Sequence, residues 1–262
     1  MTDEHWSQRD YGVRLEWGPV GAARLSEPEA AVVVVDVLCF TTCVSVAVGR
    51  GTAVRPAPWR GDRAQELAER LGADLAVGRE EVTAERPYSL SPAHLLAAPP
   101  SRLLVLPSPN GSTIAASART GTVVAGCLRN ASAVADWLLT QGYGSPRRPV
   151  VLVPAGERWP DGSLRPALED LLGAAAVLAA LEGRVTGPLS PEARATLPVV
   201  TAVTDVHATL RECGSGRELV DRGWPANVDL AAERDADRVV PVLVDGTFAD
   251  LSGRPPGTAP EG

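Results

Sequence analysis

The chain has 262 residues, 45% of them hydrophobic and 22% charged, so it can bury a full core and is neither a disordered nor a fibrous protein. Its formal net charge of -7 argues against nucleic acid or an anionic membrane surface as a partner. All 25 basic side chains are arginine, which excludes lysine Schiff-base chemistry and a phosphate-binding lysine, although a GC-rich genome accounts for the same bias.

Short apolar runs alternate with longer helical segments, a pattern that predicts an α/β fold with a mostly parallel sheet. Strands are expected at Val13–Trp17, Ala30–Leu38, Asp74–Gly78, Arg102–Pro107, Thr122–Gly126 and Pro149–Gly156. Helices are expected at Thr41–Arg50, Asp62–Leu71, Ser112–Arg119, Ala131–Gln141 and Pro166–Leu181. Pro191–Ala236 is expected to be mostly helical, and Val239–Phe248 to form a strand and turn. The predicted architecture is one three-layer α/β/α domain over residues 1–250, with a helical C-terminal part and a disordered tail at 251–262.

Localisation and redox state follow from the N-terminus and the cysteines. The first residues, MTDEHWSQRD, are polar and acidic, unlike a signal peptide, and the apolar stretch Leu171–Leu181 is too short to span a bilayer. The cysteines at positions 39, 43, 127 and 213 form no CxxC pair, and three lie in apolar strings, where cysteine packs as a small hydrophobe. These features predict a soluble, cytoplasmic protein that does not bind membranes.

Polar residues recur after the predicted strands, where open α/β sheets bind ligands next to helix N-termini. In VVVVDVLCFTT, Asp36 ends an apolar run, and Thr41 and Thr42 stand at the start of the next helix. In one interpretation Asp36 holds Mg²⁺ and the threonines bind phosphate oxygens. In the other, Asp36 is a buried turn residue and the threonines are helix caps. The local sequence favours neither.

Two further segments follow the same pattern. In VLPSPNGST, a glycine that tolerates a left-handed conformation precedes polar residues at a helix start. The segment suits either an anion-binding turn or an ordinary Asn-Gly turn. The candidate binding residues are Asn110, Gly111, Ser112 and Thr113. In GCLRNASAVA, Asn130 is expected to cap a helix. Arg129 offers a planar fork for phosphate or sulfonate, although an exposed, solvated arginine is the more frequent case.

The fourth segment, VLVPAGERWPDGSLRPALEDLL, carries three carboxylates of interest. Glu157 lies in the loop after a strand, and Glu169 and Asp170 occupy the first turn of an apolar helix. Acidic residues in a first turn ordinarily complement the helix dipole. A metal-supporting pair with Asp36 is the alternative. Adjacent helical residues point about 100° apart, so at most one of Glu169 and Asp170 is expected to face the site.

Taken in order, these segments resemble the 2-phosphosulfolactate phosphatase family. The resemblance rests on VVVVDVLCFTTCVSVAVGRG, LSPAHLL, LPSPNGSTIA, GCLRNASAVA, PAGERWPDGSLRPALEDLLGAAAVLAAL and the C-terminal block from CGSGREL to VLVDGTF. It implies an α/β/α phosphatase with Mg²⁺ and substrate at the carboxyl ends of the strands. Family positions are matched by Asp36, Asn110, Gly111, Asn130, Glu169 and Asp170, and conservatively by Thr41, Thr42, Ser112 and Thr113.

The chain departs from the family pattern at two places. The family usually has arginine after Asp-Val-Leu, where this chain has Cys39, and it reads Gly-Glu-Arg where this chain has Gly78-Arg79-Glu80. Loss of an arginine at a helix start removes a charge-assisted contact with an anionic substrate. The family's reaction is therefore a firmer expectation than its doubly anionic substrate.

We predict a Mg²⁺-dependent phosphatase acting on a small anionic phosphate monoester, with 2-phosphosulfolactate as one candidate. Asp36 with Glu169 or Asp170 would hold Mg²⁺, the turn at 110–113 and the helix start at Thr41 and Thr42 would hold phosphoryl oxygens, and Glu157 would take a proton from the attacking water. The alternatives are a non-catalytic protein that binds an anionic metabolite, and a lyase or isomerase. The resemblance also favours a homodimer.

Overall fold

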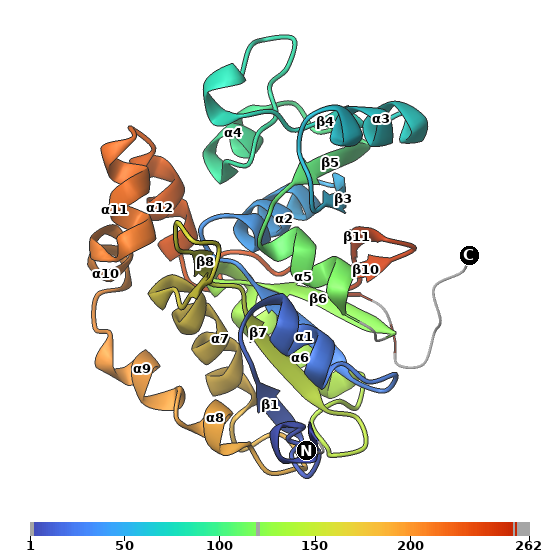
Figure 1. Ribbon diagram of the computed structural model, residues 1–262, viewed down its shortest axis with the longest axis vertical. Helices are drawn as coiled ribbons and strands as arrows, with labels where there is room; N and C mark the ends of the chain where they lie inside the picture. Colours follow the sequence, from blue (N-terminus) through green and yellow to red (C-terminus); the bar gives the residue numbers. More distant parts are fainter. Residues whose placement is uncertain (1–2, 119–120, 254, 256–262) are drawn as a thin grey trace.

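The computed structural model describes residues 3–118, 121–253 and 255, and in this part of the chain one nine-stranded sheet forms the centre of the molecule (Figure 1). Its interior strand β2 (Ala31–Val35) is buried along its whole length, as its apolar, mostly β-branched sequence predicts. In spatial order the strands are β1 (Val13–Leu15), β7 (Val150–Pro154), β2, β6 (Thr122–Gly126), β10 (Pro241–Val244), β11 (Thr247–Asp250), β3 (Ala53–Ala57), β5 (Leu103–Pro107) and β4 (Asp74–Leu75).

The sheet consists of two parallel groups joined by a hairpin. Strands β1, β7, β2 and β6 are mutually parallel, and so are β3, β5 and β4. Between them, β10 pairs antiparallel with β6 at Val242 and Val124, and β11 pairs antiparallel with β3 at Phe248 and Val54. Because three antiparallel pairings separate the groups, the second group runs opposite to the first. The ligand-binding edge is therefore not the single common edge of a parallel sheet.

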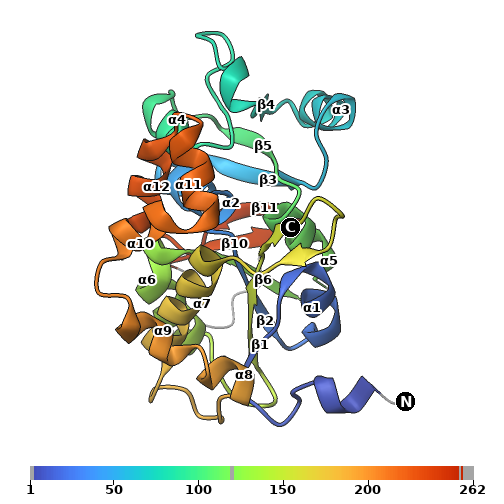
Figure 2. The ribbon, with the colours of Figure 1, turned by 60° about the vertical axis from the view of Figure 1, so that its left-hand side comes forward.

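Helices cover both faces of the first group, which confirms the predicted three-layer α/β/α fold (Figure 2). On one face lie α1 (Gly18–Leu25) and α5 (Gly111–Ser117), which contact each other. On the other lie α6 (Ala131–Thr140), α7 (Leu168–Leu181) and α9 (Leu197–Ala202), with α7 packed between the other two. Helix α2 (Phe40–Gly49) contacts β6, β3 and β11 and so bridges the two strand groups.

The C-terminal third is helical, as predicted. Its helices are α8 (Pro191–Arg194), α9, α10 (Val206–Glu212), α11 (Gly214–Asp221) and α12 (Pro225–Ala232). Helix α12 packs on α4 (Pro92–Ala97), so the C-terminal helices cover the segment that follows β4. The remaining elements are α3 (Asp62–Leu71), the 3-10 turns η1 (Asp3–Trp6), η2 (Arg79–Glu81) and η3 (Leu128–Asn130), and a small hairpin of β8 (Glu157–Arg158) and β9 (Leu164–Arg165).

The predicted elements agree with the structure where the pattern was continuous. Helix α3 and strand β6 have their predicted bounds, and Val239–Phe248 forms the β10–β11 hairpin around Asp245 and Gly246, both with positive φ. Strand β3 was missed because Arg55 and Pro56 interrupt its apolar pattern. Helices α1 and α4 were also missed. The predicted tail falls mostly on residues 254 and 256–262, and Arg119 was placed in a helix; all of these lie outside the described residues.

Within the described ranges, no helix has both the length and the apolar character needed to cross a bilayer. The four cysteines are buried and form no disulfide, which for Cys39, Cys43 and Cys127 agrees with the predicted packing role.

Candidate active site

A cleft of about 640 Å³ lies where the loops after β2, β4, β5 and β7 meet helix α11. Among its lining residues are Asp36 and Cys39 after β2, Arg79 in η2, Ser108 and Asn110 after β5, Glu157 after β7, and Ser215 and Leu219 of α11. The two strand groups thus direct the loops at their carboxyl ends toward the same cleft, although they run in opposite directions.

Asp36 is the first residue after β2 and is 4% exposed. Its Oδ1 accepts a hydrogen bond from the backbone N–H of Phe40 at 3.1 Å, and its Oδ2 accepts one from Gly111 N–H at 2.8 Å. Burial raises the pKa of Asp36 to about 6, assisted by the negative charge of Glu169 and opposed by these two hydrogen bonds. A buried carboxylate therefore joins the starts of α2 and α5 at the cleft.

Glu157 enters the cleft from the loop after β7. Its Oε2 accepts a hydrogen bond from the side-chain amide of Asn110 at 2.9 Å. Burial raises the pKa of Glu157 to about 7, and the charges of Asp36 and Glu169 add to this effect. A carboxyl group with such a pKa can accept a proton efficiently near neutral pH.

Asp170 ties the loops of these two carboxylates together. Its Oδ1 accepts from Val37 N–H at 2.7 Å and its Oδ2 from Gly156 N–H at 2.8 Å, and these residues directly follow Asp36 and precede Glu157. Burial raises the pKa of Asp170, with contributions from the charges of Asp36 and Glu169. Because both its oxygens accept backbone hydrogen bonds and it does not line the cleft, Asp170 positions the site. This corrects its predicted role as a metal ligand or catalytic group.

The three loops form a closed ring of hydrogen bonds. Asp170 joins the loops after β2 and β7, Asn110 joins the loop after β5 to Glu157, and Gly111 joins it to Asp36. Each loop is therefore held by two others, an arrangement that fixes the relative positions of the carboxylates at 36 and 157.

Only glycine fits at position 111. A Cβ there would lie 2.2 Å from Cδ1 of Phe40 and 2.9 Å from Oδ2 of Asp36. Phe40 cannot move aside, since it is fully buried and packs edge-on against Phe248 with ring centroids 6.2 Å apart. We expect Gly111→Ala to lower the free energy of unfolding by about 2–3 kcal/mol in urea titrations, with loss of the ordered site. Gly49→Ala in α2, where the nearest atom would be 3.9 Å away, should be neutral or stabilising. Equal stability of the two variants would contradict the close packing at Gly111.

Arg79 places a guanidinium beside Cys39, the position at which the family usually has an arginine. Its Nη2 lies 3.4 Å from Sγ of Cys39, directly at the start of α2. Burial raises the pKa of the Cys39 thiol to about 12, with Arg79 opposing the shift. Cys39 is therefore an unreactive neighbour of the arginine. In the sequence, Arg79 differs from the family pattern, but nothing there marks it as a residue of the cleft.

Thr41 and Thr42 do not face the cleft, which corrects their predicted contact with phosphate. Both are fully buried. The Thr41 hydroxyl donates to the carbonyl of Asp36 and accepts from its N–H, and the Thr42 hydroxyl donates to the carbonyl of Val37. The threonines stabilise the turn between β2 and α2 through its carbonyls. Neither is the helix cap that the alternative interpretation predicted, because the N-cap of α2 is Cys39.

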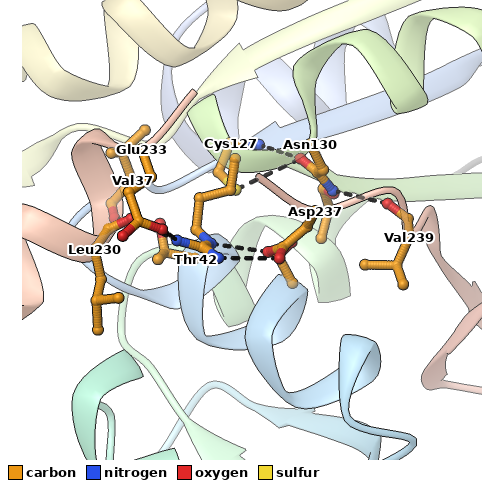
Figure 3. A network of polar contacts seen from close by, with 11 residues as sticks. Val37, Thr42, Cys127, Asn130, Leu230, Glu233, Asp237 and Val239 are labelled. Atoms are coloured by element: carbon orange, nitrogen blue, oxygen red, sulfur yellow. Dashed lines mark hydrogen bonds and ion pairs between the residues drawn. The ribbon is translucent and has the colours of Figure 1, made fainter. Parts of the chain in front are cut away.

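Arg129 is likewise withdrawn from the predicted substrate site. Its guanidinium forms a bidentate pair with Asp237 at 2.8 and 3.0 Å and contacts Glu233, in a network of which Figure 3 shows Asp237, Glu233 and Leu230. It is 6% exposed and does not line the cleft. It joins the start of α6 to the segment before β10 and cannot offer a free fork to a ligand.

Asn130 and the hydroxyls after Gly111 also have structural partners. Asn130 stands at the start of α6, but its amide donates to the carbonyls of Ala125 and Val239 instead of capping the helix (Figure 3). Ser112 donates to the carbonyl of Leu106 and Thr113 to that of Pro109. In the turn after β5, Ser108 and Asn110 line the cleft instead. Ser108 was missed, although it is the first polar residue after the apolar run.

Glu169 lies among the other carboxylates and is 1% exposed. Its charge raises the pKa of Asp36 and Glu157, and its Oε2 accepts from the Cys213 thiol at 3.3 Å. Among the described residues, no group of three or more His, Cys, Asp or Glu side chains is arranged to hold a metal ion. The predicted trio of Asp36, Glu169 and Asp170 is therefore not a preformed metal cage.

Comparisons with known proteins identify relatives of this chain. The family model described as 2-phosphosulpholactate phosphatase matches residues 21–246, which include all the loops of the cleft. A protein of Carboxydothermus hydrogenoformans named probable 2-phosphosulfolactate phosphatase is 27% identical over 216 residues, which cover 81% of this chain and 86% of the relative.

Proposed function

The chain belongs to the 2-phosphosulpholactate phosphatase family and is a phosphoric monoester hydrolase, and we propose that it hydrolyses a small phosphate monoester in this cleft with the help of Mg²⁺. The observation that carries the proposal is the pairing of a buried carboxylate, Asp36, with a carboxyl of near-neutral pKa, Glu157, at one cleft. The hydrogen-bonded ring holds both in place.

The donor set suits Mg²⁺. The charge of Glu169 raises the pKa of Asp36, and the charges of Asp36 and Glu169 raise the pKa of Glu157, so the site carries excess negative charge that a cation would neutralise. Mg²⁺ commonly uses one or two protein carboxylates and takes its other ligands from water and substrate phosphate, so a site without a third protein carboxylate fits it. Asp36 lines the cleft and would hold the ion, whereas Asp170 does not line it. Glu169 would be the second carboxylate, because its charge acts on both Asp36 and Glu157. When bound, Mg²⁺ supplies positive charge next to the phosphoryl oxygens.

The remaining roles fall to side chains of the cleft. Glu157 accepts the proton of the water that attacks phosphorus, and Asn110 keeps its carboxylate oriented toward that water. Ser108 offers a hydroxyl to the phosphoryl group from the same wall as Asn110. Asp170 keeps the loops of Asp36 and Glu157 at a constant separation, which in-line attack requires. No lysine exists to support a phospho-aspartyl mechanism of the lysine-dependent type.

The relative's name suggests 2-phosphosulfolactate as the substrate to test first. The experiment is phosphate release from a panel of small phosphate monoesters, 2-phosphosulfolactate included, with Mg²⁺ and with the metal removed by a chelator. We expect release from at least one ester in the presence of Mg²⁺, and loss of it on chelation. No release from any ester by folded protein that still binds these esters would contradict the phosphatase proposal. It would instead favour a non-catalytic binding protein, or a lyase or isomerase.

A further inference from the structure

The proposed base, Glu157, stands on a small hairpin outside the nine-stranded sheet. Strands β8 and β9 form a separate two-stranded sheet, in which Glu157 lies opposite Arg165. The chain enters this hairpin through Gly156, which has a positive φ of 66°. A two-stranded hairpin has little stability of its own. The position of Glu157 therefore depends on the contacts that hold the hairpin against the rest of the molecule.

Arg165 connects this hairpin to helix α11, which forms another wall of the cleft. Its Nη2 donates a hydrogen bond to Oγ of Ser215 at 3.0 Å, and Ser215 is 5% exposed and lines the cleft. A Cβ at Gly214 would lie 3.4 Å from Nη1 of Arg165, so the guanidinium packs against the first turn of α11. Within the hairpin, the ring centroid of Trp159 lies 5.8 Å from the guanidinium carbon. Arg165 thus joins the wall that carries Glu157 to the wall that carries Ser215.

Stability alone does not explain an arginine at this place. The first turn of a helix carries the positive end of its dipole and disfavours a neighbouring cation. In the part of the chain that the structure describes, no carboxylate forms an ion pair with Arg165 to offset this cost. By contrast, the buried arginines Arg14 and Arg129 each pair with a carboxylate. Residues that break such a local rule are commonly those of functional sites.

We propose that Arg165 is a positioning residue of the phosphatase reaction, which holds the hairpin against α11 through Ser215 and so keeps the carboxylate of Glu157 in the cleft. This inference rests on the proposed function, in which Glu157 accepts the proton of the attacking water. Asn110 holds the carboxylate itself, whereas Arg165 holds the strand pair that bears it. A displacement of about 1 Å in a catalytic group can lower a rate by about a hundred-fold. The contact therefore matters although Arg165 does not line the cleft.

Arg165 also acts on Glu157 through its charge, and the two effects can be separated. Its positive charge lowers the pKa of Glu157, opposite to the effect of the neighbouring carboxylates. Loss of this charge should move the acid-side decrease of activity to higher pH. Loss of the contact with Ser215 should instead lower kcat at every pH. A residue needed only for folding would change neither property in protein that remains folded.

The test is a double-mutant cycle of Arg165→Met and Ser215→Ala in the full chain, with Mg²⁺ and the ester that the wild type hydrolyses best. We expect each single variant to lower kcat about ten- to a hundred-fold, with KM changed less than about threefold. The double variant should lose no more than Arg165→Met alone, because both substitutions remove the same contact. Arg165→Met should also shift the acid-side decrease to higher pH. Arg165→Lys, which keeps the charge without the fork, should leave that decrease in place and recover part of kcat.

Arg217→Met is the matched control, because Arg217 is an exposed arginine of the same helix outside the cleft and should change kcat less than about threefold. Hydrogen exchange of the amides of residues 157–165 needs no turnover. It should become about tenfold faster in Arg165→Met and Ser215→Ala, and stay unchanged in Arg217→Met. Faster exchange in these variants of a wild type that releases no phosphate would contradict the proposed function and still support the contact. Losses in kcat that multiply in the double variant, or hairpin exchange at the wild-type rate, would overturn the inference.

Discussion

Replacing Asp36 by asparagine is expected to lower kcat/KM by about a thousand-fold or more. The change removes the buried negative charge that we assign to Mg²⁺ binding. It also replaces one of two acceptor oxygens with an NH₂ group that would face the N–H of Phe40 or Gly111. The measurement is phosphate release at saturating Mg²⁺, combined with calorimetric titration of the metal, which we expect to bind much more weakly to Asp36→Asn.

Asp10→Asn is the matched control, because Asp10 is an exposed aspartate outside the cleft. Circular dichroism would establish that Asp36→Asn still folds, as the hydrogen bonds of Thr41 and Thr42 in the same turn are retained. Full activity in a folded Asp36→Asn protein would remove this residue from the mechanism.

The second large effect is expected for Glu157→Gln, which should reduce kcat by roughly a hundred- to ten-thousand-fold. In the wild type, kcat/KM should fall as the pH decreases through about 7, because protonated Glu157 cannot accept a proton from water. This limb of the pH profile should disappear in Glu157→Gln. Glu66→Gln, at an exposed glutamate of α3, should keep the wild-type profile. A wild-type limb that persists in Glu157→Gln would assign the base to another group.

Glu157→Gln, which should lower the activity, is expected to raise the stability of the protein at alkaline pH. The pKa of Glu157 is raised in the folded state, so its contribution favours folding below about pH 4.5 and is lost as the pH rises through about 7. At about pH 8 without Mg²⁺, Glu157→Gln should therefore be more stable than the wild type by roughly 1–3 kcal/mol, allowing for partial solvent screening. At about pH 4.5 the two proteins should unfold at similar urea concentrations. A destabilised Glu157→Gln at pH 8 would mean that the hydrogen bond from Asn110 outweighs the electrostatic cost.

Several residues of the site follow from sequence because they stand next to strands. The apolar runs of β2, β5 and β7 place Asp36, Asn110 and Glu157 just beyond their carboxyl ends, whatever the order of the strands. The helical C-terminal part follows from its periodicity and its proline and glycine boundaries. The local sequence did not decide whether the carboxylates of Asp36 and Asp170 bind a ligand or accept hydrogen bonds from the backbone.

The roles of neighbouring residues in the same turns depended on contacts between distant parts of the chain. Glu169 and Asp170 are adjacent in sequence, yet only Asp170 accepts from both Val37 and Gly156. Arg129 and Arg79 both follow strands, but Asp237, more than a hundred residues away, pairs with Arg129, whereas Arg79 lines the cleft.

The amino-acid sequence by itself determined the α/β class and the short list of polar residues at the strand ends, because burial of a strand requires a local run of apolar side chains. Only the tertiary structure decided which of these residues face the cleft. The β10–β11 hairpin reverses the second strand group, and hydrogen bonds between separate loops consume the donors and acceptors of Thr41, Thr42 and Asp170. Asp36 and Glu157 also accept hydrogen bonds from another loop, but they line the cleft. Whether a polar side chain reaches the cleft therefore depends on partners that are distant in sequence.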